Sequence, residues 1–179
     1  MGWQRLGSKT VFKGRVHILE FDVVLPDGST STYQVEHSDG HAAATLILLQ
    51  NGNLLLSRQY RFPLDREIYD LPGGSGPKSE SAEDIAIREC QEEVGIAPTE
   101  LHKLATFYPN PARTDWPMHV FFCNSYKESA LDAYDPSEEV EKVEITPRAL
   151  SRLIDNGEIV DPSLLIGWGI ALQRGYIQP

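Results

Sequence analysis

Cysteine and long apolar runs are both scarce in this sequence. The chain has two cysteines, Cys90 and Cys123, and neither belongs to a C-x-x-C pair. That excludes a disulfide framework and is poor material for a zinc site, so we expect reduced thiols in the core. No apolar run approaches the length of a membrane span, and the opening MGWQRLGSKT lacks the apolar segment of a secretion signal. We therefore expect a cytoplasmic protein without a membrane partner.

Positive charge is also in short supply. Lysine and arginine number 16 against 26 aspartates and glutamates, which gives a formal net charge of -10. A nucleic-acid partner is disfavoured, because phosphate backbones are held by clustered basic side chains. A small phosphorylated ligand is still compatible, provided that a divalent metal held on carboxylates neutralises it.

The length and an apolar content of 41% suit one globular domain over residues 1–179. The first forty residues are typical of strands, with a hairpin of 16–25 and 29–36 around Pro26-Asp27-Gly28. A sharp break is expected at 71–74. Further strands are expected at 42–49, from 54, and at 101–108, 119–125 and 140–145, and helices at 82–94, 148–156 and 163–174. This irregular alternation predicts an α+β fold of the α/β/α sandwich type.

Three carboxylates share one edge of the predicted helix 82–94, which Ser81 is expected to cap and Gly95 to end. At about 100° per residue, Glu89, Glu92 and Glu93 fall within an arc of roughly 100°. The adjoining arc is apolar and is expected to face the core. It contains Ala86, Ile87, Cys90 and Val94.

Like charges at this spacing repel each other on a bare helix, so stability alone does not favour them. Hard oxygen ligands attract Mg²⁺ or Mn²⁺, and a bound cation removes the repulsion. An isolated E-x-x-E-E group is nevertheless more often a solvated acidic face. The surrounding sequence decides between the two interpretations.

A long pattern surrounds these carboxylates. Gly74, five residues, Glu80, seven residues and then the run 88–96, RECQEEVGI, match the box of the Nudix hydrolase family at every fixed position. Cys90 stands where the family more often has an aliphatic residue. The sequence thus resembles Nudix hydrolases, which cleave nucleoside diphosphates linked to another moiety. The resemblance implies an α/β/α sandwich and Mg²⁺ as cofactor, with Mn²⁺ as a possible substitute.

The resemblance also implies roles for the box residues. The metal ligands would be the carbonyl of Gly73 and the carboxylates of Glu89, Glu92 and Glu93, the last two also being catalytic. Arg88 is expected to pair with Glu80 and hold the loop on the helix, unless Glu80 is merely exposed. Gly74 and Gly95 would serve the shape of the backbone.

Residues outside the box bear on the substrate. The segment RQYR, with Arg58 and Arg61, followed by Asp70, is similar to the R-Q-Y-R…E-x-P-x-G arrangement of ADP-ribose and nucleotide-sugar pyrophosphatases, and both arginines are candidate phosphate ligands. Pro111 lies fifteen residues after the box, a spacing associated with the same subgroup.

Two departures qualify this interpretation. Asp70 stands where the subgroup usually has Glu, and the segment 112–116, which includes Arg113 and Trp116, replaces its more usual Gly-aromatic segment. Asp70, Pro111 and Arg113 are further candidates for substrate binding. ADP-ribose, cleaved to AMP and ribose 5-phosphate, is the leading hypothesis.

In that subgroup a catalytic Glu often comes from an acidic loop near the end of the sheet. Glu138 or Glu139 would be that general base here, if the loop closes over the substrate. Each is otherwise one member of a solvated charge run.

The strands within 1–40 exceed a minimal Nudix core, and in the resembling subgroup such strands build a homodimer. We therefore expect a homodimer. The alternatives are another Nudix enzyme, acting on dinucleoside polyphosphates or capped RNA, and a non-catalytic sensor of a nucleotide sugar. Sensors tend to lose box carboxylates, and none is missing from this box.

Overall fold

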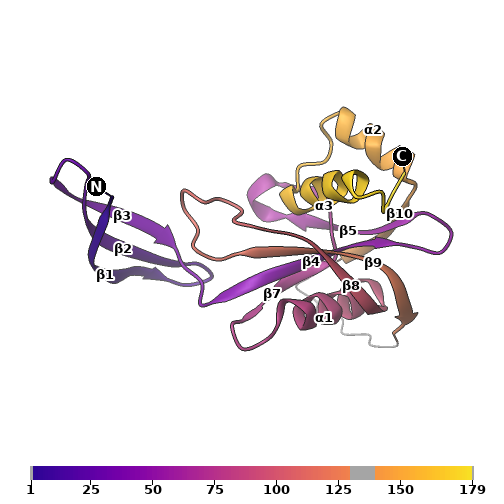
Figure 1. The fold of residues 1–179 in the computed structure, drawn as a ribbon, viewed down its shortest axis with the longest axis horizontal. Coiled ribbons are helices and arrows are strands. Elements are labelled where there is room, and N and C mark those ends of the chain that lie inside the picture. The colour runs from indigo at the N-terminus through magenta and orange to yellow at the C-terminus, as the bar shows by residue number, and fades with distance from the viewer. Residues whose placement is uncertain (1, 130–139, 179) are drawn as a thin grey trace.

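The computed structural model describes residues 2–129 and 140–178 of the chain. These residues form two sheets, a small one at the N-terminus and a larger one that carries the helices (Figure 1). The smaller sheet has three antiparallel strands in sequence order. Its strands are β1 (Gln4–Lys13), β2 (His17–Val24) and β3 (Thr30–Glu36).

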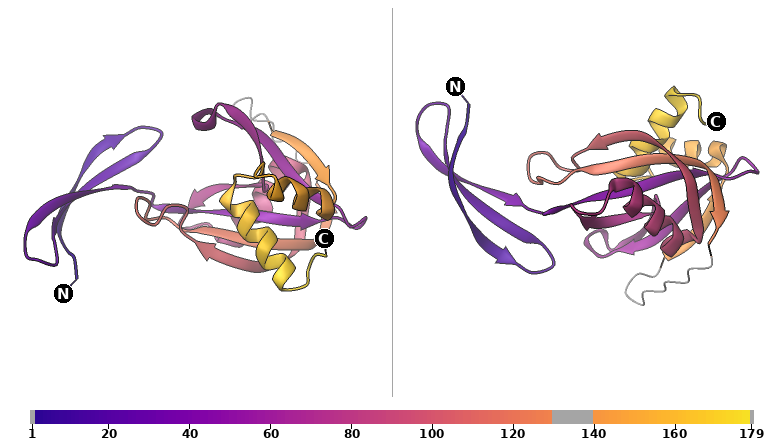
Figure 2. Two further views of the ribbon diagram at one scale, coloured as in Figure 1. Left: turned by 90° about the horizontal axis from the view of Figure 1, so that it is seen from above. Right: turned by 60° about the horizontal axis from the view of Figure 1, so that its bottom comes forward.

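The N-terminal sheet stands apart from the rest of the molecule in both views of Figure 2. Every residue of β1 is exposed, and among described residues 2–36 the buried apolar side chains are Val23 and Val35. A sheet with so little buried surface gains little from the hydrophobic effect. Several of its large apolar side chains remain in contact with solvent instead.

The larger sheet has seven strands and is mixed, because β4 pairs in parallel with β9 and the remaining ladders are antiparallel. The order is β10-β5-β4-β9-β8, with β6 on β5 and β7 on β4. The strands are β4 (Gly40–Leu48), β5 (Leu54–Arg61), β6 (Arg66–Asp70), β7 (Gly73–Pro77), β8 (Ile96–Phe107), β9 (Met118–Glu128) and β10 (Val140–Ile145).

Helices cover both faces of this sheet (Figure 1). On one face lies α1 (Ala82–Val94), and on the other lie α2 (Pro147–Asp155) and α3 (Pro162–Gln173). Successive residues of β4 serve the two layers: Leu46 belongs to the core cluster beneath α2 and α3, and Ile47 belongs to the cluster with Cys90 and Val94 of α1. A central strand buried on both faces explains why residues 42–48 are apolar apart from Thr45. The α/β/α sandwich is confirmed.

Most predicted elements are present, and the differences have a common cause. The predicted break at 71–74 is wrong in its second half, because Gly73 and Gly74 begin β7. That strand, GGSGP, and β6 have weak local signals and form because they pair with apolar β4 and with β5. Tertiary pairing overrides propensity in both.

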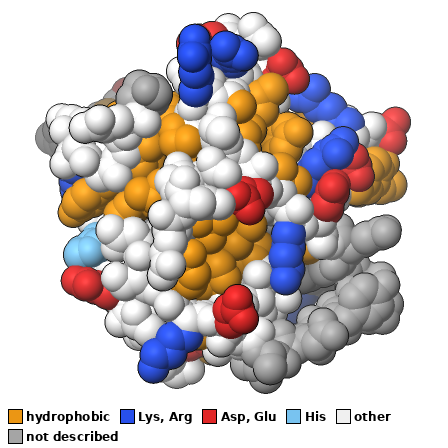
Figure 3. Space-filling view, turned by 90° about the vertical axis from the view of Figure 1, so that its right-hand side faces the viewer, with side chains coloured by type: hydrophobic (Ala, Val, Ile, Leu, Met, Phe, Trp, Pro, Cys, Tyr) orange, Lys and Arg blue, Asp and Glu red, His pale blue; other side chains and the backbone are white. Residues whose placement is uncertain are grey.

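No helix among the described residues is long and apolar enough to cross a membrane. At the end of the molecule remote from the N-terminal sheet, apolar side chains reach the surface between charged groups of both signs (Figure 3).

Candidate active site

Helix α1 begins and ends as its sequence dictates. The Ser81 hydroxyl accepts from the Asp84 amide at 3.0 Å, and Gly95 closes the helix in the left-handed region, at φ 68°. Ala86 and Cys90 are fully buried against the sheet. Burial raises the pKa of Cys90 to about 12, so its thiol is no nucleophile at neutral pH.

The carboxylate edge of α1 lies against the backbone of β7. Glu89 is buried, with 8% of its surface exposed. A Cβ on Gly74 would clash with the carboxylate of Glu89, so a larger residue there would displace that carboxylate. One turn along the helix, Oε2 of Glu93 accepts from the Gly73 amide at 3.3 Å. The glycines therefore bring main-chain atoms of β7 beside two of the predicted ligand carboxylates.

Arg88 ties the predicted box residues together. Its guanidinium donates to Glu80 at 3.1 Å, to Glu89 at 2.7 Å and to Glu92 at 3.0 Å. It also donates to the carbonyl of Ser75 in β7 at 3.2 Å. The structure thus contains the expected Arg88–Glu80 pair and adds two further carboxylates to it. This network clamps β7, the following turn and α1 to one another.

The charge balance around Arg88 bears on metal binding. Burial acts to lower the pKa of Arg88, but hydrogen bonds to Glu80 and Glu89 outweigh it and raise the pKa above its ordinary value. One guanidinium balances only one of the three carboxylates that it contacts. The donor set is made of hard oxygens, so it fits Mg²⁺ or Mn²⁺. Glu89, Glu92, Glu93 and the carbonyl of Gly73 are the residues that would hold the ion.

Within residues 2–129 and 140–178, no group of three or more His, Cys, Asp or Glu side chains is arranged to hold a metal ion as it stands. Glu89 and Glu92 are instead engaged by Arg88. Metal binding would therefore exchange contacts with Arg88 for contacts with the ion. The general-base candidates Glu138 and Glu139 lie outside the described residues.

The arginines of the RQYR segment have acidic partners. Arg58 pairs with Glu67 at 2.6 Å and more loosely with Glu141 at 3.4 Å. Arg61 pairs with Asp70, a candidate substrate residue that is itself buried. The other oxygen of Asp70 accepts from the amide of Leu71 at 2.9 Å. This arrangement makes Asp70 an anchor for Arg61, whose side chain is 42% exposed.

A second carboxylate joins this pair. Asp161 caps α3 by accepting from the amide of Leu164 at 2.7 Å, and it lies beside Asp70. Burial first, and the charge of Asp70 second, raise the pKa of Asp161 to about 7. The Asp-Pro pair at 161–162 is a sequence signal for a helix N-cap, but its contact with Asp70 depends on tertiary packing.

Pro111 and Arg113 lie on the loop between β8 and β9, which extends towards the N-terminal sheet and away from the C-terminal half of α1 (Figure 1). The Arg113 carbonyl accepts from the Glu36 amide at 2.8 Å, and the Ala112 carbonyl accepts from the Tyr33 hydroxyl at 2.5 Å. Both loop residues line a pocket of about 340 Å³, together with Trp3, Arg5, Phe21, Val23, Tyr33 and Val35 of the sheet. Within one chain, this loop is thus joined to the N-terminal sheet and not to the box.

Comparison with known proteins identifies the domain that carries this site. The family model of the NUDIX domain matches residues 40–164. An ADP-ribose pyrophosphatase of Bacillus subtilis (strain 168) is 32% identical over 160 residues, which cover 87% of this chain and 85% of that protein. A methanol dehydrogenase activator of Bacillus methanolicus is 30% identical over 162 residues, covering 89% and 86%.

A third relative, an ADP-ribose pyrophosphatase of Mycobacterium tuberculosis (strain ATCC 25618 / H37Rv), is 27% identical over 186 residues, covering 99% of this chain and 87% of its own. Among solved structures, an ADP compounds hydrolase superposes with a TM-score of 0.86 over 98% of this chain and 96% of that one. Its sequence identity of 18% makes this a likeness of fold. The matched domain, the relatives and the box carboxylates together show that the chain belongs to the Nudix family and is a Nudix hydrolase.

Proposed function

We propose that the protein hydrolyses the pyrophosphate bond of a nucleoside diphosphate sugar with Mg²⁺ as cofactor, ADP-ribose giving AMP and ribose 5-phosphate being the leading case. One observation carries the proposal: a complete set of box carboxylates on α1 in a chain 32% identical to an ADP-ribose pyrophosphatase over 85% of that protein's length. Both parts are needed, since the box by itself does not identify a substrate.

We assign three roles to the candidate residues: phosphate binding, metal binding and general-base catalysis. We propose that Arg61, held by Asp70, and Arg58, paired with Glu67, bind phosphate oxygens, because planar guanidinium groups match them in two-point contacts. Glu89, Glu92 and Glu93 would bind the ion together with the Gly73 carbonyl. When bound, the cation would neutralise charge on the two phosphates and lower the pKa of a water molecule. Glu138 or Glu139 is proposed as the base that accepts its proton.

The N-terminal sheet supports the proposal of a homodimer. Its exposed apolar side chains include Leu6 at 63%, Trp3 at 56% and Phe12 at 54%. Large apolar side chains left exposed in such number by a small sheet favour an interaction surface. We propose that a second copy of the chain covers them, so that light scattering at micromolar concentration should give twice the mass of one chain. A monomer at that concentration would overturn this.

The test of the activity is a substrate panel on the wild-type protein beside Glu93→Gln. Released phosphomonoester is measured for ADP-ribose, other nucleotide sugars, dinucleoside polyphosphates and capped RNA, with Mg²⁺ and with Mn²⁺. Glu93→Gln removes one charge with little change in volume, so we expect a loss of roughly 3–5 kcal/mol of transition-state stabilisation. Glu83→Gln, on the exposed first turn of the same helix, is the matched control and should retain activity.

Failure to turn over any diphosphate with either metal would rule the proposal out. A second role is suggested by the relative named as a methanol dehydrogenase activator, and a sensor that binds a nucleotide sugar would be of this regulatory kind. Calorimetry with ADP-ribose separates the two, because a sensor binds the ligand without consuming it.

A further inference from the structure

The turn that joins β7 to α1 is held by a side chain from β4. The ring Nε2 of His41 lies 2.8 Å from the backbone carbonyl of Glu80, in a partly buried contact. A carbonyl oxygen only accepts hydrogen bonds, so Nε2 is the ring nitrogen that donates. The strand register places His41 opposite Gly76, just ahead of this turn.

The residue held in this way is the one that anchors Arg88. The Glu80 side chain accepts from Nε of Arg88 at 3.1 Å, and the other arm of the same guanidinium contacts Glu89 and Glu92. The turn also lies close against β7, because a Cβ on Gly76 would fall 2.4 Å from Oε2 of Glu80. The position of the Glu80 backbone therefore sets where Arg88 sits among the carboxylates.

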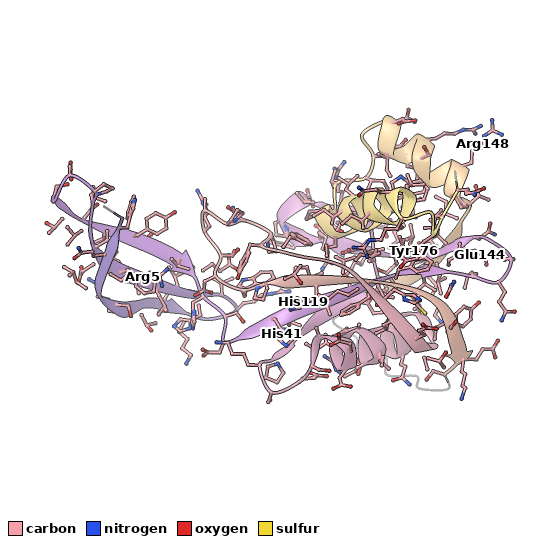
Figure 4. The ribbon with its side chains drawn as sticks, in the orientation of Figure 1. Arg5, His41, His119, Glu144, Arg148 and Tyr176 are labelled. Carbon is pink, nitrogen blue, oxygen red and sulfur yellow. The ribbon has the colours of Figure 1, made fainter. Side chains whose placement is uncertain are left out.

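The imidazole of His41 is itself fixed by a second ring. His119 of β9 meets it edge to face, with centroids 5.2 Å apart and planes at 86°, and both residues lie where β4 and β9 run side by side (Figure 4). The Nδ1 of His119 is 2.9 Å from the Thr106 hydroxyl. Burial, followed by the charges of Lys103 and His41, lowers the pKa of His119, which keeps that ring neutral beside His41.

We propose that His41 is a positioning residue for the metal site. Its hydrogen bond to the Glu80 carbonyl holds the turn, and Glu80 in its turn holds Arg88. With Arg88 held there, Glu89 and Glu92 can exchange their contacts with it for contacts with a divalent cation. This inference rests on the proposed metal dependence. Without the donor, the turn relaxes, and Arg88 is free to follow Glu89 and Glu92 as their contacts change. The cation then competes against a more mobile guanidinium, and its affinity falls.

The test distinguishes the hydrogen bond donated by His41 from the packing of its ring. His41→Phe keeps the aromatic packing against His119 and removes the donor, whereas His41→Gln keeps an N–H at a similar reach. Binding of Mn²⁺ alone, followed by electron paramagnetic resonance without substrate, is the main readout. We expect His41→Phe to weaken Mn²⁺ binding about tenfold or more, which is the range for groups that orient metal ligands. His41→Gln should stay within about threefold of wild type.

The control is His119→Phe, which preserves a ring against His41 but loses the contact with Thr106, and it should bind Mn²⁺ as the wild type does. In a Glu80→Gln background, where the Arg88 anchor is already weakened, the effect of His41→Phe should shrink, because both changes act through one chain of contacts. If His41→Phe does not fold, His41→Asn takes its place, because its shorter amide does not span the contact.

Three results would overturn the inference: wild-type affinity in His41→Phe, equal losses in His41→Phe and His41→Gln, or a wild-type protein that binds no Mn²⁺. The readout needs no turnover, so its outcome is independent of the substrate panel. A protein that binds Mn²⁺ yet hydrolyses nothing would refute the proposed function and leave the role of His41 open to the same measurement.

Discussion

The N-terminal sheet and the rest of the described chain, which we call the body, differ in how far they bury their apolar side chains. In the body, a seven-stranded sheet buries apolar residues on both faces beneath α1 on one side and α2 and α3 on the other. None of the residues in its core clusters comes from β1, β2 or β3 of the described chain. The N-terminal sheet keeps its hydrogen-bonded ladders and leaves several of its large apolar side chains exposed.

This difference shows that strand pairing and core formation are separable. The body has a core of its own, and the helix that carries the box packs against that core. The N-terminal sheet has hydrogen-bonded ladders without a core. Its exposed apolar side chains contribute to stability only if another surface covers them. The two regions should therefore respond differently to mutation, pH and concentration.

The largest difference is expected from truncating one large apolar residue in each region. Phe122 is 1% exposed and stacks on Tyr176 with centroids 4.7 Å apart, so Phe122→Ala should lower the free energy of unfolding by about 3–5 kcal/mol. In the N-terminal region, Val16→Ala, at a residue 42% exposed, should cost no more than about 1 kcal/mol. Urea denaturation measures both. Similar losses would mean that the N-terminal sheet is as tightly packed as the body.

Changes on the N-terminal sheet should act on association instead. Trp3→Ala and Phe12→Ser each remove an exposed apolar side chain, and each should raise the dissociation constant of the proposed homodimer about tenfold or more, or roughly 1.4 kcal/mol. Analytical ultracentrifugation over a dilution series gives the constant. Phe62→Ser, an 82% exposed residue in the body, tests whether apolar exposure alone produces the effect.

The carboxylate pair in the body predicts a pH dependence of stability. The pKa of Asp161 is raised to about 7, so the folded state holds a proton that the unfolded chain releases near pH 4. The stability contribution is complete below that ordinary pKa and is lost as the pH rises through the raised one. Asp161→Asn, which can still cap α3, should remove this decline, worth about 1–3 kcal/mol between pH 5 and 8.

Thermal melts of wild type and Asp161→Asn at a series of pH values measure this effect. Asp155→Asn, at the exposed last turn of α2, is the control and should follow the wild type. If the melting temperatures of wild type and Asp161→Asn change with pH in the same way, the raised pKa of Asp161 is contradicted.

The smallest effect is expected where the two regions meet. The ring Nδ1 of His37 lies 2.6 Å from a carboxylate oxygen of Asp115 on the β8–β9 loop, and this hydrogen bond raises the pKa of His37. The contact is therefore complete below the ordinary pKa of histidine and weakens as the pH rises through the raised value. Hydrogen exchange at the Glu36 amide, corrected for the intrinsic rate, should show a loss of protection of less than about tenfold, or 1.4 kcal/mol. His37→Gln should remove the pH dependence, and its persistence would place the cause elsewhere.

Local signals predicted both ends of α1, the helix that carries the box carboxylates. Ser81, Gly95 and the apolar arc between them are sufficient to define 82–94, and the same wheel placed the carboxylates beside the core, where Glu89 is indeed buried. The strand β10 at 140–145 was equally predictable, and α2 and α3 begin within one residue of their expected starts. These elements have caps or periodicity of their own.

What escaped prediction depends on pairs that are distant in sequence. β7 has a glycine-rich sequence that favours a turn, and it becomes a strand because β4 offers it a ladder and because the glycines admit Glu89. The role of Asp70 as a buried anchor for Arg61, its neighbour Asp161 and the hydrogen bond from His41 to Glu80 are of the same kind. Each joins residues whose local patterns are unremarkable.

The sequence by itself determined the family, the helix α1 and the identity of the candidate ligands, because the box is a run of short-range constraints on one helix and the segment before it. Only the tertiary structure decided how those ligands are balanced. It set Arg88 among three carboxylates, placed His41 against the Glu80 turn and joined the Pro111 loop to the N-terminal sheet. Charge balance and hydrogen bonding depend on distances in space, and these are fixed when the sheets and helices pack.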